Sequence, residues 1–204
     1  MASSSSVMVD CDYRRHACVL VWKKEDAVNA LEYYATPETT LPAELAFGTL
    51  MVRDAPSVRH QEAVGSFFAA LRDHVRSHAL GRVWVAPLDV VLDEGAALIV
   101  QPDVTYVRRE RDAIVRRRIY GAPDLVVEIL SPHPRVGDFE RRLGWFAAYG
   151  VQECWAYHQP AQRLEIVEFE DRRIVRRRWI ERDDSIDSRC LPAFSLPLGD
   201  VVDY

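Results

Sequence analysis

The chain has 204 residues, a formal net charge of −5, and a composition that is 49% hydrophobic and 28% charged. These values fit one globular domain with a well-buried core and exclude an intrinsically disordered chain. No apolar run approaches the length of a membrane-spanning helix, and the opening residues MASSSSVMVD lack the basic and apolar regions of a secretory signal, so we expect a cytoplasmic protein with no membrane segment.

The four cysteines are spread along the chain without the paired short spacing of a zinc ribbon or the density of a disulfide-stabilised domain. Cys11 and Cys18 flank His16, but the six residues between them miss the usual spacing of zinc ligands. We therefore expect Cys11, Cys18, Cys154 and Cys190 to be free thiols.

Residues 1–35 are predicted to form an N-terminal appendage of unassigned role, followed by a single domain over residues 36–204. The appendage contains a serine tract, the apolar stretch ACVLVW and a helix from Lys24 to Tyr34. The domain begins near LPAELAFGTLMV, where Glu44 and Gly48 lie in a segment that we interpret as a helical turn leading into a strand.

An amphipathic helix is predicted from Ser57, a favourable N-cap, to Gly81, a C-terminal stop. Its apolar residues recur at three- and four-residue intervals: Val64, Phe67, Phe68, Leu71 and Val75. The segments Val83–Asp93 and Ala96–Val107 follow on either side of Glu94-Gly95, and their alternating apolar residues predict two strands joined by a tight turn.

The segment Asp124–Leu130, DLVVEIL, is short, β-branched and almost entirely apolar, which is typical of a central strand. After a loop, the sequence predicts a helix capped by Asp138 and ended by Gly150, a strand over Val151–His158, and a hairpin around Asp171. The order of core elements is therefore α-β-β-β-α-β, with an antiparallel pair leading into a βαβ crossover. This order indicates an α/β fold.

Arginines crowd two connections, residues 108–118 and 172–178. A solvated surface explains such clusters as well as contact with DNA does, and self-association is a third interpretation. Because the net charge is negative, any attraction for nucleic acid must come from local basic patches such as these.

Three carboxylates lie in or beside strands that are otherwise apolar. Asp103 follows Pro102, and Glu128 lies near the end of its strand, where a buried charge is costly unless it meets a metal ion or an open cleft. Asp124 lies four residues before Glu128 and therefore points to the same face. Each residue alone is explained as well by a strand end or a solvent-facing position. Together they favour a site for Mg²⁺, which prefers oxygen ligands.

Three stretches resemble the Uma-type restriction endonucleases of the PD-(D/E)XK nuclease superfamily. They are QPDVTYV, GAPDLVVEILSP, and the spacing D-x-x-x-R-x-x-x-F-x-x-Y-G-V-x-E-x-W from Asp138 to Trp155. The resemblance extends over about residues 41–170, through Glu44, Gly48, APSVRHQ and GRVWVAPLDVVLD. Its central stretch is specific, because chance rarely places these motifs at this distance. The resemblance implies a restriction-endonuclease-like core, a mixed central sheet flanked by helices.

The resemblance also implies roles for individual residues. Asp103 and Glu128 match metal ligands that are also catalytic. Glu44 matches a glutamate that reaches the metal from an N-terminal helical region. Asp124 is either a ligand or an anchor at the start of its strand. His60 matches the family's PSxxH segment, as a phosphate contact, a partner that orients a ligand, or a neighbour of the helix cap.

The sequence departs from the superfamily at its lysine. Two residues beyond Glu128 stands Leu130, and the family shifts this lysine to the following helix, where the chain has Arg142. An arginine keeps the positive charge but is not deprotonated and presents a wider fork. Two smaller departures are Phe47, where the family tends to an acid, and His158, where it tends to an aspartate.

The implied function is a Mg²⁺-dependent endonuclease, with Mn²⁺ as an alternative metal, that hydrolyses phosphodiester bonds of DNA as a homodimer. Asp103 and Glu128 would hold the metal, and Arg142 would stabilise charge on the phosphate. The alternative is a catalytically impaired protein of the same fold that binds nucleic acid or a protein partner, because the expected lysine is missing.

Overall fold

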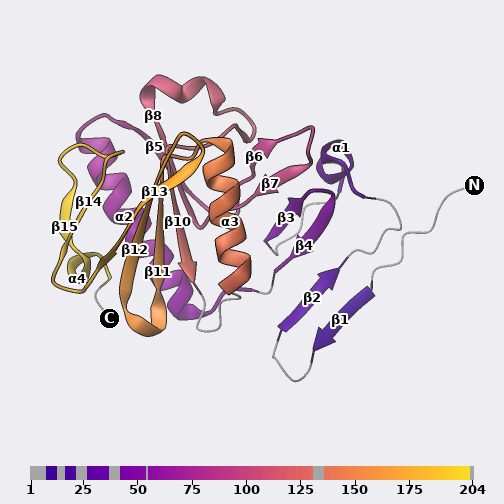
Figure 1. The fold of residues 1–204 in the computed structure, drawn as a ribbon, viewed down its shortest axis with the longest axis horizontal. Helices are drawn as coiled ribbons and strands as arrows, with labels where there is room; N and C mark the ends of the chain where they lie inside the picture. Colours follow the sequence, from indigo (N-terminus) through magenta and orange to yellow (C-terminus); the bar gives the residue numbers. More distant parts are fainter. Residues whose placement is uncertain are drawn as a thin grey trace, which may run out of the picture.

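The computed structural model describes residues 8–12, 17–21, 27–36, 42–53, 55–130 and 136–202, with backbone alone for 8–12, 17–21 and 136–138. Two larger sheets and a two-stranded sheet carry the fold, with helices packed against them (Figure 1). Among the described residues, no helix is long and apolar enough to span a membrane.

The central sheet has six strands in the order β13-β12-β11-β10-β8-β5. β10 and β11 are parallel and are joined by the helix α3, while the other neighbours are antiparallel, so the sheet is mixed as predicted. The bounds are β5 (Gly81–Val85), β8 (Val104–Arg108), β10 (Leu125–Leu130), β11 (Glu153–His158), β12 (Arg163–Glu170) and β13 (Arg173–Ile180).

Two helices cover opposite faces of this sheet. α2 (Val58–Ser77) begins after the predicted cap Ser57 and buries Phe67 and Leu71 against one face. α3 (Val136–Tyr149) packs Leu143 and Phe146 on the other (Figure 1). α3 begins two residues before Asp138, so the prediction of Asp138 as its cap is wrong, and the side chain of Asp138 lies outside the described residues.

The second sheet has seven strands in the order β1-β2-β4-β3-β7-β6-β9. Its strands are β1 (Met8–Asp12), β2 (Ala17–Val21), β3 (Ala43–Ala46), β4 (Thr49–Val52), β6 (Val90–Asp93), β7 (Leu98–Val100) and β9 (Ile119–Tyr120). β6 pairs in parallel with β9, and the other neighbours are antiparallel.

The two long predicted strands are each divided between the sheets. Residues 83–93 give β5 and β6, and residues 96–107 give β7 and β8; β5 pairs with β8 in one sheet while β6 pairs with β7 in the other. Pro87 and Pro102 lie at the breaks, where a residue without an N–H cannot continue a ladder of hydrogen bonds. The break leaves Gln101 and Asp103 at the junction of the sheets.

The segment around Glu44 is a β-hairpin and not the predicted helical turn. β3 and β4 pair around Phe47 and Gly48, which have φ of 50° and 84°. Two successive residues with positive φ suit a tight hairpin turn. The alanines and glutamate of β3 favour a helix locally, but pairing with β4 and β7 overrides that preference.

The N-terminal segment contacts this hairpin through residues 28–33. α1 (Ala30–Tyr34) is capped by Asn29, so it begins six residues later than the predicted Lys24, which lies outside the described residues. The N–H of Val28 donates to the Gly48 carbonyl at 2.9 Å, and the Tyr33 hydroxyl donates to the Ala43 carbonyl at 2.8 Å. The boundary near residue 35 stays a prediction.

The remaining elements complete the fold. β12 and β13 form the predicted hairpin around Asp171, and short helical turns η1 (Arg109–Ile114) and η2 (Gln159–Ala161) connect strands. β14 (Ser185–Asp187), β15 (Ser195–Pro197) and α4 (Leu198–Val201) follow. Cys154 and Cys190 are buried free thiols, as predicted, whereas the side chains of Cys11 and Cys18 lie outside the described residues.

Candidate active site

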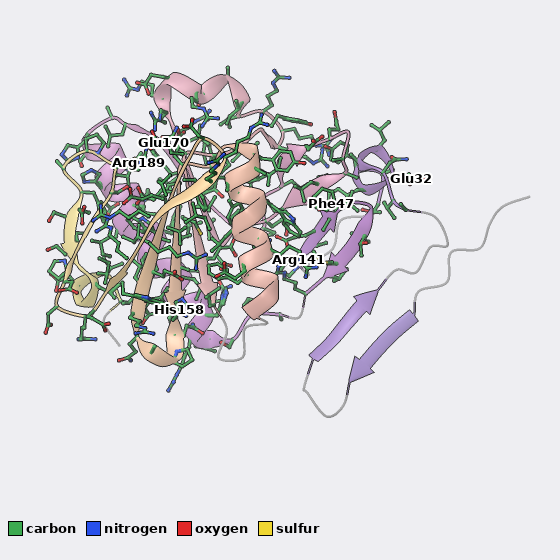
Figure 2. All side chains as sticks on the ribbon, viewed as in Figure 1. Glu32, Phe47, Arg141, His158, Glu170 and Arg189 are labelled. Carbon is green, nitrogen blue, oxygen red and sulfur yellow. The ribbon has the colours of Figure 1, made fainter. Side chains whose placement is uncertain are left out.

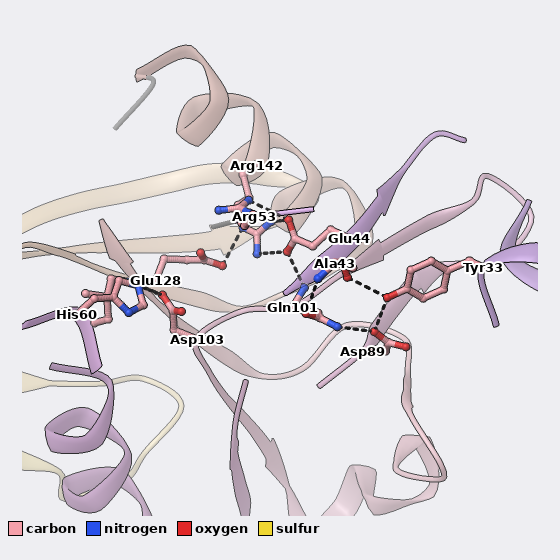
Figure 3. Close-up of polar contacts among 11 residues, drawn as sticks. Tyr33, Ala43, Glu44, Arg53, His60, Asp89, Gln101, Asp103, Glu128 and Arg142 are labelled. Carbon is pink, nitrogen blue, oxygen red and sulfur yellow. Dashed lines mark hydrogen bonds and ion pairs between the residues drawn. The ribbon is translucent and has the colours of Figure 1, made fainter. Parts of the chain in front are cut away.

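Asp103 and Glu128 lie beside each other on neighbouring strands. The antiparallel register pairs Val104 of β8 with Val127 of β10, so the next pair places Asp103 opposite Glu128. The N–H of Ile129 donates to Asp103 Oδ2 at 2.7 Å, which fixes one oxygen of that carboxylate at the strand end. The two residues that the sequence singled out as metal ligands are therefore brought together (Figure 3).

Arg142 joins this pair from α3. Its Nε donates to Glu128 Oε1 at 2.8 Å, as expected for a residue of a crossover helix that overlies the preceding strand. Its Nη1 and Nη2 lie 3.0 and 2.9 Å from the two carboxylate oxygens of Glu44. Arg142, Glu44 and Glu128 are all buried, and the guanidinium lies between the two carboxylates (Figure 3).

Glu44 is held by more donors than any other carboxylate of this site. Besides Arg142, Arg53 Nη2 donates to Oε2 at 2.8 Å and the N–H of Gln101 donates to Oε1 at 2.6 Å. Burial alone would raise the pKa of Glu44, but the charges of Arg142 and Arg53 lower it to about 2. Glu44 is thus an ionised carboxylate whose two oxygens are both engaged, and it reaches the site from strand β3.

Glu128 has the opposite electrostatic balance. Burial raises its pKa to about 7, and the charge of Arg142 only partly offsets burial and the repulsion of Asp103 and Glu44. Within the described residues, Glu128 accepts from Arg142, whereas several donors engage Glu44. Burial is therefore balanced less fully at Glu128 than at Glu44.

His60 lies in the first turn of α2 and faces Asp103. Its backbone N–H donates to the cap Ser57 Oγ at 3.2 Å, while its Nε2 lies 3.5 Å from Asp103 Oδ2. Burial lowers the pKa of His60, but the hydrogen bond and charge of Asp103 outweigh burial and raise it overall. The backbone of His60 is therefore part of the helix cap, while its imidazole ring lies at the candidate active site.

Asp124 lies at the other end of β10, away from Glu128. Four residues of strand span about 13 Å. The carboxylate of Asp124 is fully buried and is bound by the Arg108 backbone N–H at 2.9 Å, by Arg108 Nε at 2.7 Å and by Arg111 Nη1 at 3.1 Å. Of the two roles left open by the sequence, these contacts favour the anchor at the start of the strand.

A family model described as "Uma2: Putative restriction endonuclease" matches residues 30–199. The chain belongs to the Uma2 family. Among solved structures, a "putative nuclease belonging to DUF820" from Anabaena variabilis ATCC 29413 superposes with a TM-score of 0.71 and 17% identity, covering 86% of this chain and 97% of that chain. At this identity the likeness establishes the fold alone. None of the curated proteins matches significantly.

The two smaller departures of this Uma2 chain lie outside the carboxylate cluster. Phe47, at the tip of the β3–β4 hairpin, is exposed and packs edge-on against Trp145, with ring centroids 5.7 Å apart. His158 ends β11 and lies 3.6 Å from Glu165.

The donor set fits a metal held by two carboxylates. In the part of the chain that the structure describes, no group of three or more His, Cys, Asp and Glu side chains is arranged to hold a metal ion. Mg²⁺ usually keeps several waters and is often bound through one or two carboxylates. Asp103 and Glu128 supply two, on adjacent strands and beside the guanidinium of Arg142.

Arg53 and Gln101, which help to hold Glu44, were not predicted from the sequence. Gln101 also donates through Nε2 to Asp89 at 2.9 Å, and Asp89 accepts from Arg118 Nε at 2.8 Å. Gln101 lies in the same QPDVTYV segment as Asp103, two residues before it, so this closeness in sequence could have indicated that Gln101 belongs to the site. Nothing in the local sequence distinguishes Arg53 from the other arginines.

Proposed function

We propose that this Uma2-family chain is a metal-dependent endonuclease that hydrolyses phosphodiester bonds of DNA. The supporting observation is the pair formed by Asp103 and Glu128 on adjacent strands, with Arg142 facing Glu128. A homodimer and a cytoplasmic location stay predictions.

Asp103 and Glu128 would hold Mg²⁺ or Mn²⁺, which when bound supplies Lewis-acid activation of the phosphate and lowers the pKa of a water. His60 would orient Asp103, whose Oδ2 it approaches at 3.5 Å. Arg142 would stabilise the negative charge that develops on the phosphate, because a guanidinium favours phosphate oxygens over a wide range of pH.

Glu44 is proposed to position Arg142 and not to bind the metal. Both of its oxygens already accept from Arg142, and Arg53 and the Gln101 N–H add further donors. A carboxylate with every direction occupied is a poor metal ligand but a rigid support for a guanidinium. The earlier expectation that Glu44 coordinates the metal is therefore replaced by this positioning role.

The direct test is nicking of supercoiled plasmid by the purified protein with Mg²⁺ or Mn²⁺, compared with EDTA. We expect cleavage that requires the metal and that Glu128→Gln abolishes. Glu62→Gln, an exposed glutamate of α2, is the matched control and should cleave as the wild type does. Cleavage by Glu128→Gln at the wild-type rate would refute the assignment of this site.

One observation favours the alternative of a binding protein without catalysis. Arg142 binds both Glu44 and Glu128, so in this arrangement the guanidinium is committed to the protein's own carboxylates. If wild type and Arg142→Lys both stay folded and bind DNA but neither cleaves it with metal, the binding module becomes the better description.

A further inference from the structure

An exposed tryptophan on the edge strand of the central sheet lies beside an arginine and a histidine. Trp179 of β13 is 41% exposed. The Arg163 guanidinium lies over its ring at 4.0 Å from the centroid, and the His158 ring centroid is 4.8 Å away. We call these three residues the Trp179 cluster. The endonuclease mechanism above does not use them.

The Trp179 cluster lies on the same face of the sheet as Glu128. The register runs from Glu128 to Ala156, then to Glu165 and then to Trp179, and directly paired residues point to one face. Three strand spacings separate Glu128 from Trp179, or about 14 Å. His158 lies at the end of the sheet where α3 begins, which is also the end where β10 carries Glu128 (Figure 2).

The charges around the cluster are mixed, but the edge strand itself is basic. Arg163 lies 3.9 Å from Glu181, and the buried Glu165 contacts His158 and Arg177 at 3.6 and 3.4 Å. β13 contains four arginines and no acidic residue, with the sequence RIVRRRWI, and Arg176, Arg177 and Arg178 pair with carboxylates of neighbouring elements. Charge on this strand discourages pairing with another strand edge, and the exposed ring with the Arg163 guanidinium is the feature that suits a nucleic-acid base.

We propose that the Trp179 cluster stacks an unpaired base of the DNA strand bound at Asp103 and Glu128, an inference that rests on the endonuclease function. Stacking on an aromatic ring, supported by an arginine, is how proteins bind single-stranded nucleic acid without reading its sequence. The separation of about 14 Å is within the reach of a few nucleotides of an extended single strand. Because stacked bases of a duplex hide their faces, the substrate would carry a single-stranded segment there.

The test measures equilibrium binding of a fluorescently labelled oligonucleotide, single-stranded or as a blunt duplex, in EDTA so that no cleavage occurs. Trp179→Ala should weaken single-strand binding about 5- to 150-fold, Trp179→Phe should keep most of the affinity, and duplex binding should change little. Leu31→Ala, an exposed apolar residue of α1, is the control and should bind as the wild type does. Equal loss for both DNA forms, or no loss, would overturn the proposal.

Two further readouts separate this proposal from its alternatives. Because the binding assay contains no metal, its result does not depend on cleavage. Failure of the endonuclease proposal is therefore seen in the nicking assay, and failure of the stacking proposal is seen in the binding assay. Sedimentation velocity of wild type and Trp179→Ala should give the same mass; a dimer that becomes a monomer in the variant would make the cluster an interface between two copies and refute stacking.

Discussion

Arg142 is the residue on which the proposed catalysis depends most. It replaces the lysine that the family resemblance leads one to expect, and its fork spans Glu44 and Glu128. A lysine would present one compact charge, which cannot bind both carboxylates in this way and is freer to approach a phosphate.

We expect Arg142→Lys to have higher nuclease activity than the wild type, and Arg142→Ala to be inactive. Initial rates of plasmid nicking at fixed Mn²⁺ measure this order. Arg142→Ala also leaves the buried carboxylates of Glu44 and Glu128 without their shared guanidinium, which lowers the free energy of unfolding by about 3–5 kcal/mol. Thermal denaturation must therefore show that each variant is folded at the assay temperature. Arg141→Ala, its exposed neighbour on α3, should retain wild-type activity. Unchanged nicking by Arg142→Ala would remove Arg142 from the mechanism.

The raised pKa of Glu128 predicts a pH dependence of stability in metal-free protein. The folded pKa of about 7 exceeds the unfolded value of about 4.3, so the favourable contribution of protonated Glu128 is complete below about pH 4.3 and is lost as pH rises through 7. Because the folded pKa of Glu44 is lowered to about 2, its contribution to stability is lost only at pH values below this window.

Melting temperatures of wild type and Glu128→Gln in EDTA, from pH 5 to 8, test this dependence. The wild type should lose stability relative to the variant across the window, by roughly 3 kcal/mol at most. A difference in melting temperature that stays constant with pH would show that the pKa of Glu128 is not raised into this window.

At the scale of elements, the segment around Glu44 differs most from its prediction, because it forms the β3–β4 hairpin and not a helical turn. This hairpin depends on Gly48. Gly48 has φ of +84°, and a Cβ there would lie 2.6 Å from the Cβ of Ala27. A residue with a Cβ would therefore suffer both backbone strain from the positive φ and steric overlap with Ala27. Because β3 carries Glu44, the hairpin also positions Arg142.

Gly48→Ala should therefore destabilise the protein by about 1–3 kcal/mol. Gly65→Ala, inside helix α2 with no atom within 4 Å of the new Cβ, should instead stabilise it by up to about 1 kcal/mol. Urea denaturation followed by circular dichroism compares the two alanine variants with the wild type. The same sign of change in both would contradict the strain at Gly48.

The arginine-rich connection around η1 illustrates what local sequence can and cannot predict. We expected solvated arginines, contact with DNA or self-association. Arg108 and Arg111 bind the buried Asp124, and Arg118 binds Asp89 at 2.8 Å, whereas Arg109, Arg116 and Arg117 are exposed. The cluster could be read from the sequence, but its partners lie on strands that only the fold brings near.

At the scale of the whole molecule, the site is assembled from both large sheets and from the helices α2 and α3. Helix α2 and strand β10 were predictable because their apolar patterns are local. The bond between Arg142 and Glu44 joins residues 98 positions apart, and no periodicity reveals such a pair. The family resemblance supplied Asp103 and Glu128, while Arg53, Gln101 and the role of Glu44 required the structure.

This assembly predicts that metal binding stabilises the whole domain. Glu44 lies in the seven-stranded sheet, Glu128 in the six-stranded sheet and Arg142 on α3, so a cation that relieves repulsion at Glu128 strengthens the contact between these parts. A ligand that binds only the folded state at 100 times its Kd adds about 2.7 kcal/mol to stability.

Thermal denaturation at increasing Mn²⁺ should raise the Tm of the wild type and leave that of Glu128→Gln unchanged. Glu44→Gln distinguishes the two roles of the glutamates: it should lower the starting Tm, because Arg142 and Arg53 lose a charged partner, yet keep the metal-induced rise, because Asp103 and Glu128 remain. If Glu44→Gln abolishes the rise and Glu128→Gln does not, Glu44 is the ligand and Glu128 is the support.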